Sequence, residues 1–182
     1  MPAIYLRGMS LSLSIVPAKQ EDVPSIVHLV NSAYRGDTSR KGWTTEAELL
    51  EGIRVDEAGI KQLLADANTT LLKATTEADE LVGVVQLEQQ GTSMYLGMLT
   101  VKPTLQNGGI GKQLMVAGEN LAKEKGCAKM VMTVISIRQE LIQWYQSKGY
   151  TITGDRKPFP TDPRFGIPKQ PLEFIVMEKA LA

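Results

Sequence analysis

Three glycines between a predicted strand and a predicted long helix constrain the fold of this chain more than any other segment. Residues 101–111 read V-K-P-T-L-Q-N-G-G-I-G and are followed by Lys112. Backbone N–H groups in the first turn of a helix lack intrahelical partners and carry the positive end of the helix dipole. Because glycine has no Cβ, an anion can approach those N–H groups closely. The segment therefore predicts a strand–turn–helix unit that suits a phosphate or pyrophosphate.

The two best-known phosphate-binding patterns do not match this segment. A Walker loop needs a hydroxyl residue after Gly-Lys, and Gln113 takes that place here. A dinucleotide fingerprint needs a third glycine, and Leu114 takes that place. A tight turn without a ligand is the alternative interpretation, because three-glycine patterns are weakly specific.

The remaining hydrophobic periodicity predicts a mixed α/β chain. Period-two or short apolar runs predict strands over residues 11–17, 70–75, 81–89, 93–101, 130–134, 150–153 and 172–177. Helical spacing predicts a helix capped by Asp22 and further helices over residues 46–54, 59–67, 109–125 and 139–147. Thr45 and Glu48 form a capping box for the second of these helices, and residues 155–169, with four prolines, predict a loop. We therefore expect an α/β (α+β) fold with a mixed, mostly antiparallel central sheet of about seven strands flanked by helices.

Composition and charge restrict the class of protein. Of the 182 residues, 43% are hydrophobic and 22% are charged, and 20 basic residues balance 20 acidic ones. This composition excludes a disordered chain and argues against nucleic acid or an anionic membrane as a partner bound through net charge. The single cysteine, Cys127, fits a reducing cytoplasm, and no apolar run approaches ~18 residues. We expect a cytoplasmic protein in which residues 12–182 form one domain after a lead-in over residues 1–11.

Two motifs in this order resemble the GNAT superfamily of acyl-CoA-dependent N-acyltransferases. The first is Q-x-x-G-x-G, formed by Gln106, Gly109 and Gly111 directly after a strand that ends V-x-P. The second is W-Y-Q-S-K-G-Y at residues 144–150, which resembles the later family helix that ends Y-x-x-x-G-[FY]. The likeness covers roughly residues 12–180, and it implies a GNAT-like fold.

The resemblance implies acetyl-CoA as co-substrate, and no metal. It assigns the coenzyme A pyrophosphate to backbone N–H groups of Gln106, Asn107, Gly108, Gly109, Ile110, Gly111 and Lys112. Met98, Leu99 and Val101 would offer backbone groups to the pantetheine arm and the thioester carbonyl. Tyr145 corresponds to the tyrosine near the coenzyme sulfur. Arg138 stands where the family often has Asn, so it is expected either to meet a phosphate or a substrate carboxylate, or to be solvated at the helix start.

Acyl transfer to an amine needs a neutral amine, a stabilised carbonyl oxygen and a leaving thiolate that gains a proton. The Leu99 N–H is the candidate for the carbonyl oxygen. Tyr145 is the candidate proton donor, and the alternative is a packed aromatic residue whose hydroxyl merely finds a partner. Glu88 is the candidate base, because the strand over residues 93–101 carries no carboxylate, and the alternatives are a water chain and an ordinary strand-end charge. We expect His28 to be solvated and Cys127 to be a small core residue.

Two segments are candidates for the wall of an acceptor site. Trp43 lies in G-W-T-T-E, and Phe159, Arg164 and Phe165 lie in the proline-rich segment. Together with Arg138 they would suit a small amine that carries an apolar or acidic group. The alternatives are a cap on the edge of the core for Trp43 and a stiff connector for the proline-rich segment.

We therefore expect an N-acetyltransferase that moves an acetyl group from acetyl-CoA to a primary amine of a small molecule by direct attack in a ternary complex. One alternative is a non-catalytic module that binds or senses coenzyme A or acyl-CoA. Another is an acetyltransferase for protein lysines or N-termini. The sequence does not decide the acyl chain length, the acceptor or the oligomeric state, for which a homodimer is one candidate.

Overall fold

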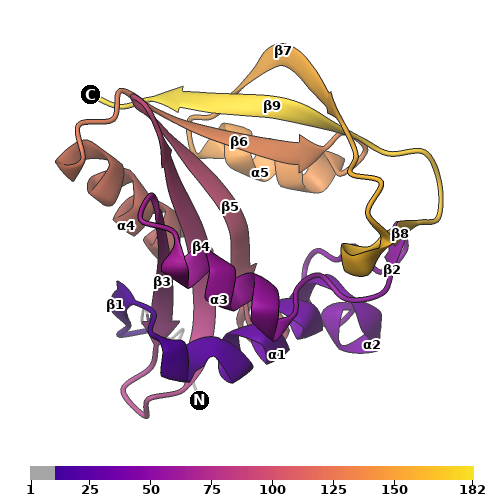
Figure 1. Ribbon diagram of the computed structural model, residues 1–182, viewed down its shortest axis with the longest axis horizontal. Coiled ribbons are helices and arrows are strands. Elements are labelled where there is room, and N and C mark those ends of the chain that lie inside the picture. Colours follow the sequence, from indigo (N-terminus) through magenta and orange to yellow (C-terminus); the bar gives the residue numbers. More distant parts are fainter. Residues whose placement is uncertain (1–10) are drawn as a thin grey trace, which may run out of the picture.

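One seven-stranded sheet with helices on both faces dominates the computed structural model, which describes residues 11–182 (Figure 1). The strand order is β1-β3-β4-β5-β6-β9-β7. Neighbouring strands are antiparallel except for β5 and β6, which are parallel. The expected mixed, mostly antiparallel sheet of about seven strands is confirmed. Of the expected lead-in over residues 1–11, all but Leu11 lies outside the described residues.

The elements follow one another in the order expected for most of the chain. The strands of the main sheet are β1 (Ser14–Pro17), β3 (Thr69–Thr75), β4 (Leu81–Gln90), β5 (Ser93–Val101), β6 (Lys129–Ile135), β7 (Thr151–Pro158) and β9 (Glu173–Ala180). A separate antiparallel pair joins β2 (Leu50–Glu51) to β8 (Ile167–Pro168). The helices are α1 (Val23–Tyr34), α2 (Gly36–Ser39), α3 (Glu57–Ala65), α4 (Ile110–Glu124) and α5 (Gln139–Ser147). None of the described helices is both long and apolar enough to cross a membrane.

Helices α1 and α3 cover one face of the sheet (Figure 1). Ile26 and Val30 of α1 and Ile60 of α3 are fully buried against Val84 and Leu71 of the central strands. Burying a side chain of this size contributes roughly 1.5–3 kcal/mol. This packing fixes α1 across β4 and β5, so the C-terminal end of α1 reaches the middle of the molecule.

Helices α4 and α5 pack on the opposite face. Leu114 and Met115 of α4 and Ile142 of α5 are buried with Leu87 and Met132 of the sheet. The apolar residues of α4 fall on one side of the helix, as the sequence predicts, so its polar side is left to solvent. The first turn of α4 lies beside the end of β5, since a Cβ added at Gly111 would be 3.6 Å from Val101 Cγ2.

The buried side chains of β5 point to one face of the sheet in its first half and to the other face from Met98 on. Met94 and Leu96 belong to the core beneath α4. Met98, the next buried residue of the alternation, belongs to the core beneath α1 and α3. The cause is a bulge, because Met98 and Leu99 of β5 oppose the single residue Val85 of β4, and Met98 has a φ of 48°. The bulge therefore interrupts the one-to-one register of β5 with β4 at Met98 and Leu99.

Strands β5 and β6 are paired at one end only. Their register covers Ser93–Tyr95 against residues 129–131, although β5 has nine residues and β6 has seven. The Tyr95 hydroxyl lies 3.4 Å from Thr133 Oγ1, across the point where the pairing ends. Beyond this point the two strands diverge, as Figure 1 shows. In their later parts, the edges of β5 and β6 that face each other are therefore unpaired and can line a site.

Two predicted elements are wrong. The helix expected over residues 46–54 is absent, and turns followed by β2 take its place. Thr45 Oγ1 accepts a hydrogen bond from the Ala47 N–H at 3.0 Å, two residues on, rather than from Glu48. The Glu46 carboxylate is buried in ion pairs with Arg35 and Arg138, which hold this turn from outside the segment. The proline-rich segment is also less irregular than expected, because β7 continues to Pro158.

Gly83 of β4 allows α4 to approach the sheet. An added Cβ would lie 2.8 Å from Leu114 Cδ1 and 3.1 Å from the carbonyl oxygen of Thr100. We expect Gly83→Ala to lower the free energy of unfolding by about 1–3 kcal/mol, because overpacking forces a backbone shift. Urea unfolding measures this change. Val116→Ala on the exposed side of α4 is the control, with a change within about 0.5 kcal/mol. An equal midpoint for Gly83→Ala and the unaltered protein would contradict the prediction.

Candidate active site

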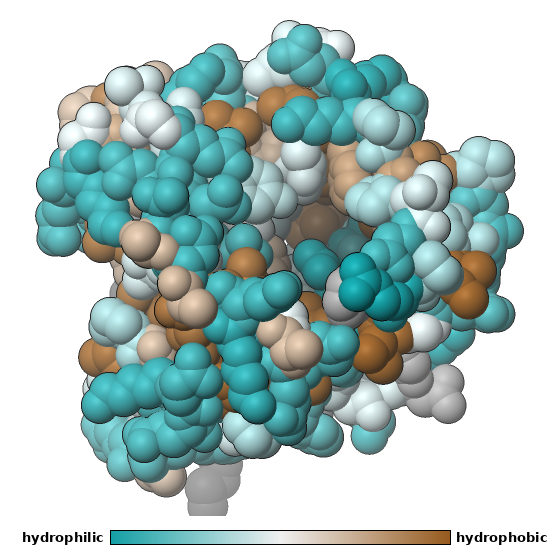
Figure 2. Space-filling view, viewed as in Figure 1, coloured by the Kyte–Doolittle hydropathy of each residue, from teal (hydrophilic) through white to brown (hydrophobic). Residues whose placement is uncertain are grey.

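Two cavities, of about 290 and 270 Å³, meet where β5 leaves β6. The first, here called the α4 cavity, reaches the first turn of α4. The second, here called the β6 cavity, runs between β5 and β6. Figure 2 shows a deep hollow near the middle of this face of the molecule. Five residues line both cavities and so mark their junction: Tyr34, Leu99, Arg138, Leu141 and Tyr145.

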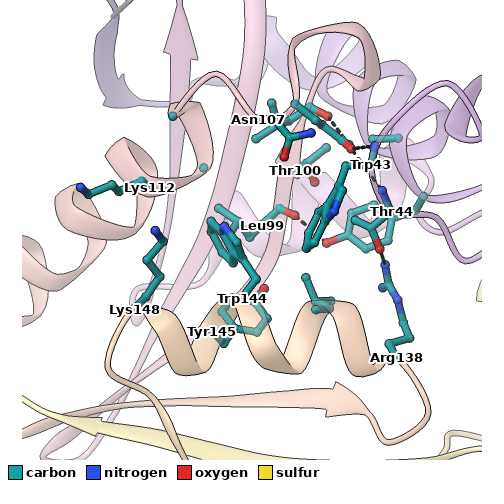
Figure 3. A pocket seen from close by; sticks show the side chains of 17 residues that line it. Trp43, Thr44, Leu99, Thr100, Asn107, Lys112, Arg138, Trp144, Tyr145 and Lys148 are labelled. Carbon is teal, nitrogen blue, oxygen red and sulfur yellow. Dashed lines mark hydrogen bonds between the residues drawn. The ribbon is translucent and has the colours of Figure 1, made fainter.

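The α4 cavity ends in a group of open N–H donors with positive charge beside them. Gly109 caps α4 with a φ of 83°, and an added Cβ there would meet nothing within 4 Å. The intrahelical ladder starts with the Gln113 N–H, which donates to the Gly109 carbonyl at 3.0 Å, so the preceding N–H groups are unused by the helix. Lys112 and Lys148 line the same end in Figure 3. This end fits a diphosphate.

Two tryptophans line the walls of the α4 cavity (Figure 3). Trp43, on the loop after α2, is 43% exposed. Trp144 of α5 lies so close to α4 that a Cβ added at Gly111 would be 3.4 Å from its Cη2 atom. The Lys148 ammonium lies 5.4 Å from the centre of the Trp144 ring. The cavity therefore joins a cationic end to aromatic walls.

The Gln106 side chain ties the loop that carries Trp43 to the end of β5. Its Oε1 accepts hydrogen bonds from the N–H groups of Trp43, at 2.6 Å, and Thr44, at 3.4 Å. Its Nε2 donates to the Val101 carbonyl at 3.3 Å. A Cβ at Gly42 would lie only 2.5 Å from Gln106 Oε1, so glycine leaves room for the contact. We call these contacts the Gln106 clasp.

Two tyrosine hydroxyls face the junction of the cavities. The Tyr34 hydroxyl, from the last residue of α1, donates to the Leu99 carbonyl at 2.7 Å. This hydrogen bond holds Leu99, one of the two bulged residues of β5, from the face of the sheet that α1 covers. Within residues 11–182 the Tyr145 hydroxyl has no hydrogen-bond partner. That hydroxyl is consequently available to a ligand.

Both tyrosines keep their protons at neutral pH. Burial raises the pKa of Tyr145 well above its ordinary value, Tyr34 raises that pKa further, and Arg138 opposes the shift. Burial also raises the pKa of Tyr34, against the effect of Arg54. Each hydroxyl is therefore a hydrogen-bond donor at this site and not a tyrosinate.

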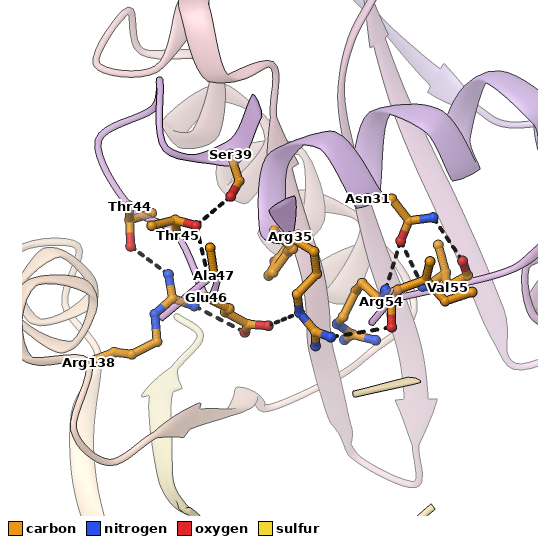
Figure 4. A network of polar contacts seen from close by, with 12 residues as sticks. Asn31, Arg35, Ser39, Thr44, Thr45, Glu46, Ala47, Arg54, Val55 and Arg138 are labelled. Atoms are coloured by element: carbon orange, nitrogen blue, oxygen red, sulfur yellow. Dashed lines mark hydrogen bonds and ion pairs between the residues drawn. The ribbon is translucent and has the colours of Figure 1, made fainter. Parts of the chain in front are cut away.

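A buried chain of charges runs beside the β6 cavity (Figure 4). Glu46 accepts from Arg35 Nε at 3.0 Å through one oxygen and from Arg138 Nη1 at 3.2 Å through the other. Arg138 Nη2 also donates to Thr44 Oγ1 at 2.5 Å. Burial lowers the pKa of Arg35, and the neighbouring Glu46 carboxylate opposes that shift. Both oxygens of this carboxylate are therefore engaged by guanidinium groups.

Residues 159–169, which follow β7 and are here called the covering segment, line one side of the β6 cavity. The β2–β8 pair joins this segment to the segment before α3. Lys169 adds two bonds, from its N–H to the Leu49 carbonyl at 2.8 Å and from its Nζ to the Ala47 carbonyl at 3.0 Å. Phe159 lines the cavity from the same segment, with its ring 5.2 Å from the ring of Phe174. The covering segment therefore starts at the paired end of β7 and is tied at its other end by β8 and Lys169.

Most of the predicted cofactor-binding residues line the α4 cavity: Leu99, Val101, Gln106, Asn107, Gly109, Gly111 and Lys112. Met98 lines the β6 cavity instead. The Ile110 side chain is 1% exposed in the core, so only its backbone could face a ligand. Gly108 is exposed beside it and lines neither cavity.

The predicted catalytic and acceptor residues are dispersed. Tyr145 and Arg138 line both cavities, Phe159 lines the β6 cavity, and Trp43 lines only the α4 cavity. Arg138 meets Glu46 and Thr44 within the protein, rather than being solvated. Glu88 is half-buried on β4 and lines neither cavity.

Two further predicted residues lie on the covering segment. Arg164 is exposed and pairs with Asp162, with Nη2 and Oδ2 2.6 Å apart, and it lines neither cavity. Phe165 ends the short helix η3 (Pro163–Phe165). As expected, His28 is exposed and Cys127 is buried. The described residues hold no group of three or more His, Cys, Asp or Glu side chains that could bind a metal ion.

Sequence analysis missed four residues that form the site. Tyr34 follows the apolar spacing of α1, so nothing distinguished it from a core residue. Glu46 lay in a segment that was predicted to be a helix. Arg35 comes directly after α1 and Arg54 comes shortly after β2, and neither belongs to a sequence motif. The ion pairs join positions far apart in the chain, so no local pattern reports them.

Comparisons with known proteins agree with this geometry. A family model described as an acetyltransferase (GNAT) domain matches residues 41–159. A comparison with curated proteins found no match.

Solved structures share the fold at low sequence identity. The ribosomal-protein-S18-alanine N-acetyltransferase from Escherichia coli has a TM-score of 0.70 at 14% identity, covering 94% of this chain and 95% of that one. The ribosomal-protein-alanine N-acetyltransferase from Brucella melitensis has a TM-score of 0.68 at 21% identity, covering 92% and 99%. The IAA acetyltransferase from Bacillus cereus has a TM-score of 0.63 at 18% identity, covering 93% and 100%. At these identities the likeness shows the fold.

The Gln106 clasp predicts local protection of the loop. We expect Gln106→Met to speed hydrogen exchange of the Trp43 and Thr44 amides by about 10-fold, because both lose their acceptor. Gly42→Ala should speed exchange of the same two amides, since the added Cβ would displace the Gln106 side-chain amide from them. Residue-resolved exchange by NMR measures both. Gln143→Met on the exposed side of α5 is the control, and equal exchange in all three variants would show that the clasp does not hold the loop.

Proposed function

Because this chain belongs to the GNAT acetyltransferase family, we propose that it moves the acetyl group of acetyl-CoA to the primary amine of a small molecule. The amine attacks the thioester directly while both substrates are bound. The observation that carries this proposal is the meeting of two cavities at Leu99 and Tyr145. One cavity would hold the donor and the other the acceptor.

The α4 cavity supports the donor half of the proposal. Its unused N–H groups, with Lys112 and Lys148 beside them, suit the diphosphate of the coenzyme. The last three residues of β5, Leu99, Thr100 and Val101, line the same cavity and would take the pantetheine arm, which ends at Leu99. Trp43 and Trp144 would line the path between these points.

The β6 cavity supports a small acceptor. Its volume is about 270 Å³, close to the lower end of ordinary small-molecule sites. The covering segment, fixed by Lys169 and the β2–β8 pair, narrows the approach of a folded polypeptide. Phe159 and Phe174 make part of the cavity apolar. These features favour a small molecule over a protein lysine or N-terminus.

The reaction forms a bond between the amine nitrogen and the acetyl carbon and breaks the bond between that carbon and sulfur. The nitrogen gives its proton to water, and the sulfur leaves as the coenzyme thiolate, which takes up a proton from water. The Leu99 N–H would face the carbonyl oxygen as charge develops on it. The Tyr145 hydroxyl would donate a hydrogen bond to the leaving sulfur. Because its pKa is raised far above the ~8.5 of an ordinary thiol, the hydroxyl stabilises the thiolate without surrendering its proton.

Among the described residues, the two carboxylates that line the β6 cavity, Glu46 and Asp162, both have cationic partners. Glu46 is held by two guanidinium groups. Asp162 bonds Arg164, which lowers the pKa of that carboxyl. The acceptor amine would therefore react in its neutral fraction, which grows as the pH rises toward the amine pKa of ~8–10.4. Glu88 plays no part in this scheme.

Tyr145→Phe tests the role of the hydroxyl. We expect turnover to fall by about 100-fold while the dissociation constant of acetyl-CoA changes by less than about threefold, because the hydroxyl acts as the sulfur leaves. Steady-state kinetics and calorimetry measure the two quantities. Tyr150→Phe is the matched control, since Tyr150 is also buried but its hydroxyl bonds Glu119 away from both cavities. Unaltered turnover of Tyr145→Phe, where chemistry limits the rate, removes the residue from the mechanism.

Thiol release from acetyl-CoA with a panel of primary amines tests the function itself. We expect amine-dependent release in the unaltered protein and none with Gly109→Glu, whose carboxylate would occupy the diphosphate site. Gly109→Asn is the control, because asparagine tolerates the left-handed backbone and carries no charge. Calorimetry should show coenzyme binding to be lost only in Gly109→Glu. Tight coenzyme binding without release for any amine would favour a non-catalytic binding module.

A further inference from the structure

We propose that Arg54 binds an anionic group of the acceptor, so that the preferred substrates are amines that also carry a carboxylate. This inference rests on the proposed function and names the substrate class of the same site. Arg54 lies between β2 and α3 and lines the β6 cavity. It is not one of the residues that the sequence motifs single out.

The backbone around Arg54 is held from one side by Asn31 of α1. The Asn31 side chain accepts from the Arg54 N–H at 2.8 Å and from the Val55 N–H at 3.1 Å. It also donates to the Val55 carbonyl at 2.9 Å. Arg35 donates to the Ile53 carbonyl at 3.3 Å. Figure 4 shows these bonds around the base of the Arg54 side chain, so the start of this side chain is fixed by helix α1.

The Arg54 guanidinium has an aromatic support but no anion. Its central carbon lies 5.6 Å from the centre of the Tyr34 ring. In the part of the chain that the structure describes, its side chain makes no hydrogen bond or ion pair. It is only half-buried, so a ligand can reach it from the cavity. A guanidinium supported in this way presents its fork to a carboxylate.

The other charges along the β6 cavity are already matched. Five charged residues line it: Arg35, Glu46, Arg54, Arg138 and Asp162. Glu46 is shared by Arg35 and Arg138, Arg138 Nε also lies 3.7 Å from Glu140 Oε1, and Asp162 is paired with Arg164. Among the described residues that line this cavity, Arg54 is therefore the cation without a carboxylate partner. An acceptor that brings one carboxylate would complete the pairing.

Tyr34 links this cation to the proposed reaction centre. One face of its ring supports Arg54, and its hydroxyl bonds the Leu99 carbonyl. The guanidinium over this ring therefore lies near the bulge of β5. A carboxylate held by Arg54 would therefore fix the position of the amine relative to the thioester.

The test compares matched acceptors in the thiol-release assay. The panel contains phenylalanine, methionine and leucine, each beside its carboxamide and its decarboxylated amine, with β-alanine and γ-aminobutyrate to vary the distance between the two groups. We expect at least one carboxylate acceptor to exceed its neutral partners by about 10- to 100-fold in kcat/KM, as a charge-assisted fork would give. In Arg54→Gln that preference should disappear, with neutral amines changed less than about threefold.

Three controls make the outcome specific. Arg54→Lys keeps the charge but not the fork, so it should restore only part of the preference. Arg156→Gln removes an exposed arginine of β7 that pairs with Glu173, and it should leave the preference intact. Melting temperatures identify any variant that has lost its fold, and such a variant is replaced by Arg54→Met.

Each remaining outcome decides the matter. Equal kcat/KM for carboxylates and neutral amines, or an equal loss for all acceptors in Arg54→Gln, overturns this inference and leaves the proposed function standing. Absence of thiol release with every amine defeats the proposed function, and this inference with it.

Discussion

The divergence of β5 from β6 is the constraint on which the rest of the site depends. A parallel pair normally continues along the full strands, but here the pairing stops after Tyr95. The bulge at Met98 and Leu99 removes β5 from its β4 register a few residues later. Two cavities can therefore reach the same stretch of backbone, and Tyr34 and Tyr145 approach it from opposite faces of the sheet. Without the divergence, Leu99 would be an ordinary ladder residue inside a closed sheet.

The local signals in the sequence were sufficient for most elements but not for this opening. Period-two runs and glycine stops predicted the three central strands, α4 and α5 well, because each depends on neighbours in the chain. The bulge was not predictable, since the apolar alternation of β5 continues through Met98 while the backbone turns it to the other core. The segment containing Glu46 was misread as a helix because its capping box is a local pattern, whereas its conformation is set by distant Arg138.

The donor half of the site was easier to predict than the acceptor half for the same reason. The glycine turn carries its own chemistry in consecutive residues, and it lines the cavity where expected. The acceptor half is assembled from α1, the turns before β2, the start of α5 and the covering segment. Arg138 and Arg164 were the basic residues that the sequence offered, yet both have carboxylate partners within the protein. Arg54, which has none among the described residues, carries no sequence signal.

The contact between Gly42 and the Gln106 amide also has an evolutionary consequence. The two positions are remote in the chain, but the space that one leaves is filled by the other. A larger residue at position 42 is tolerable only if position 106 shortens or turns away, and that would release the Trp43 loop. Substitutions at positions 42 and 106 should therefore be correlated among homologues, with a change at one position accompanied by a change at the other.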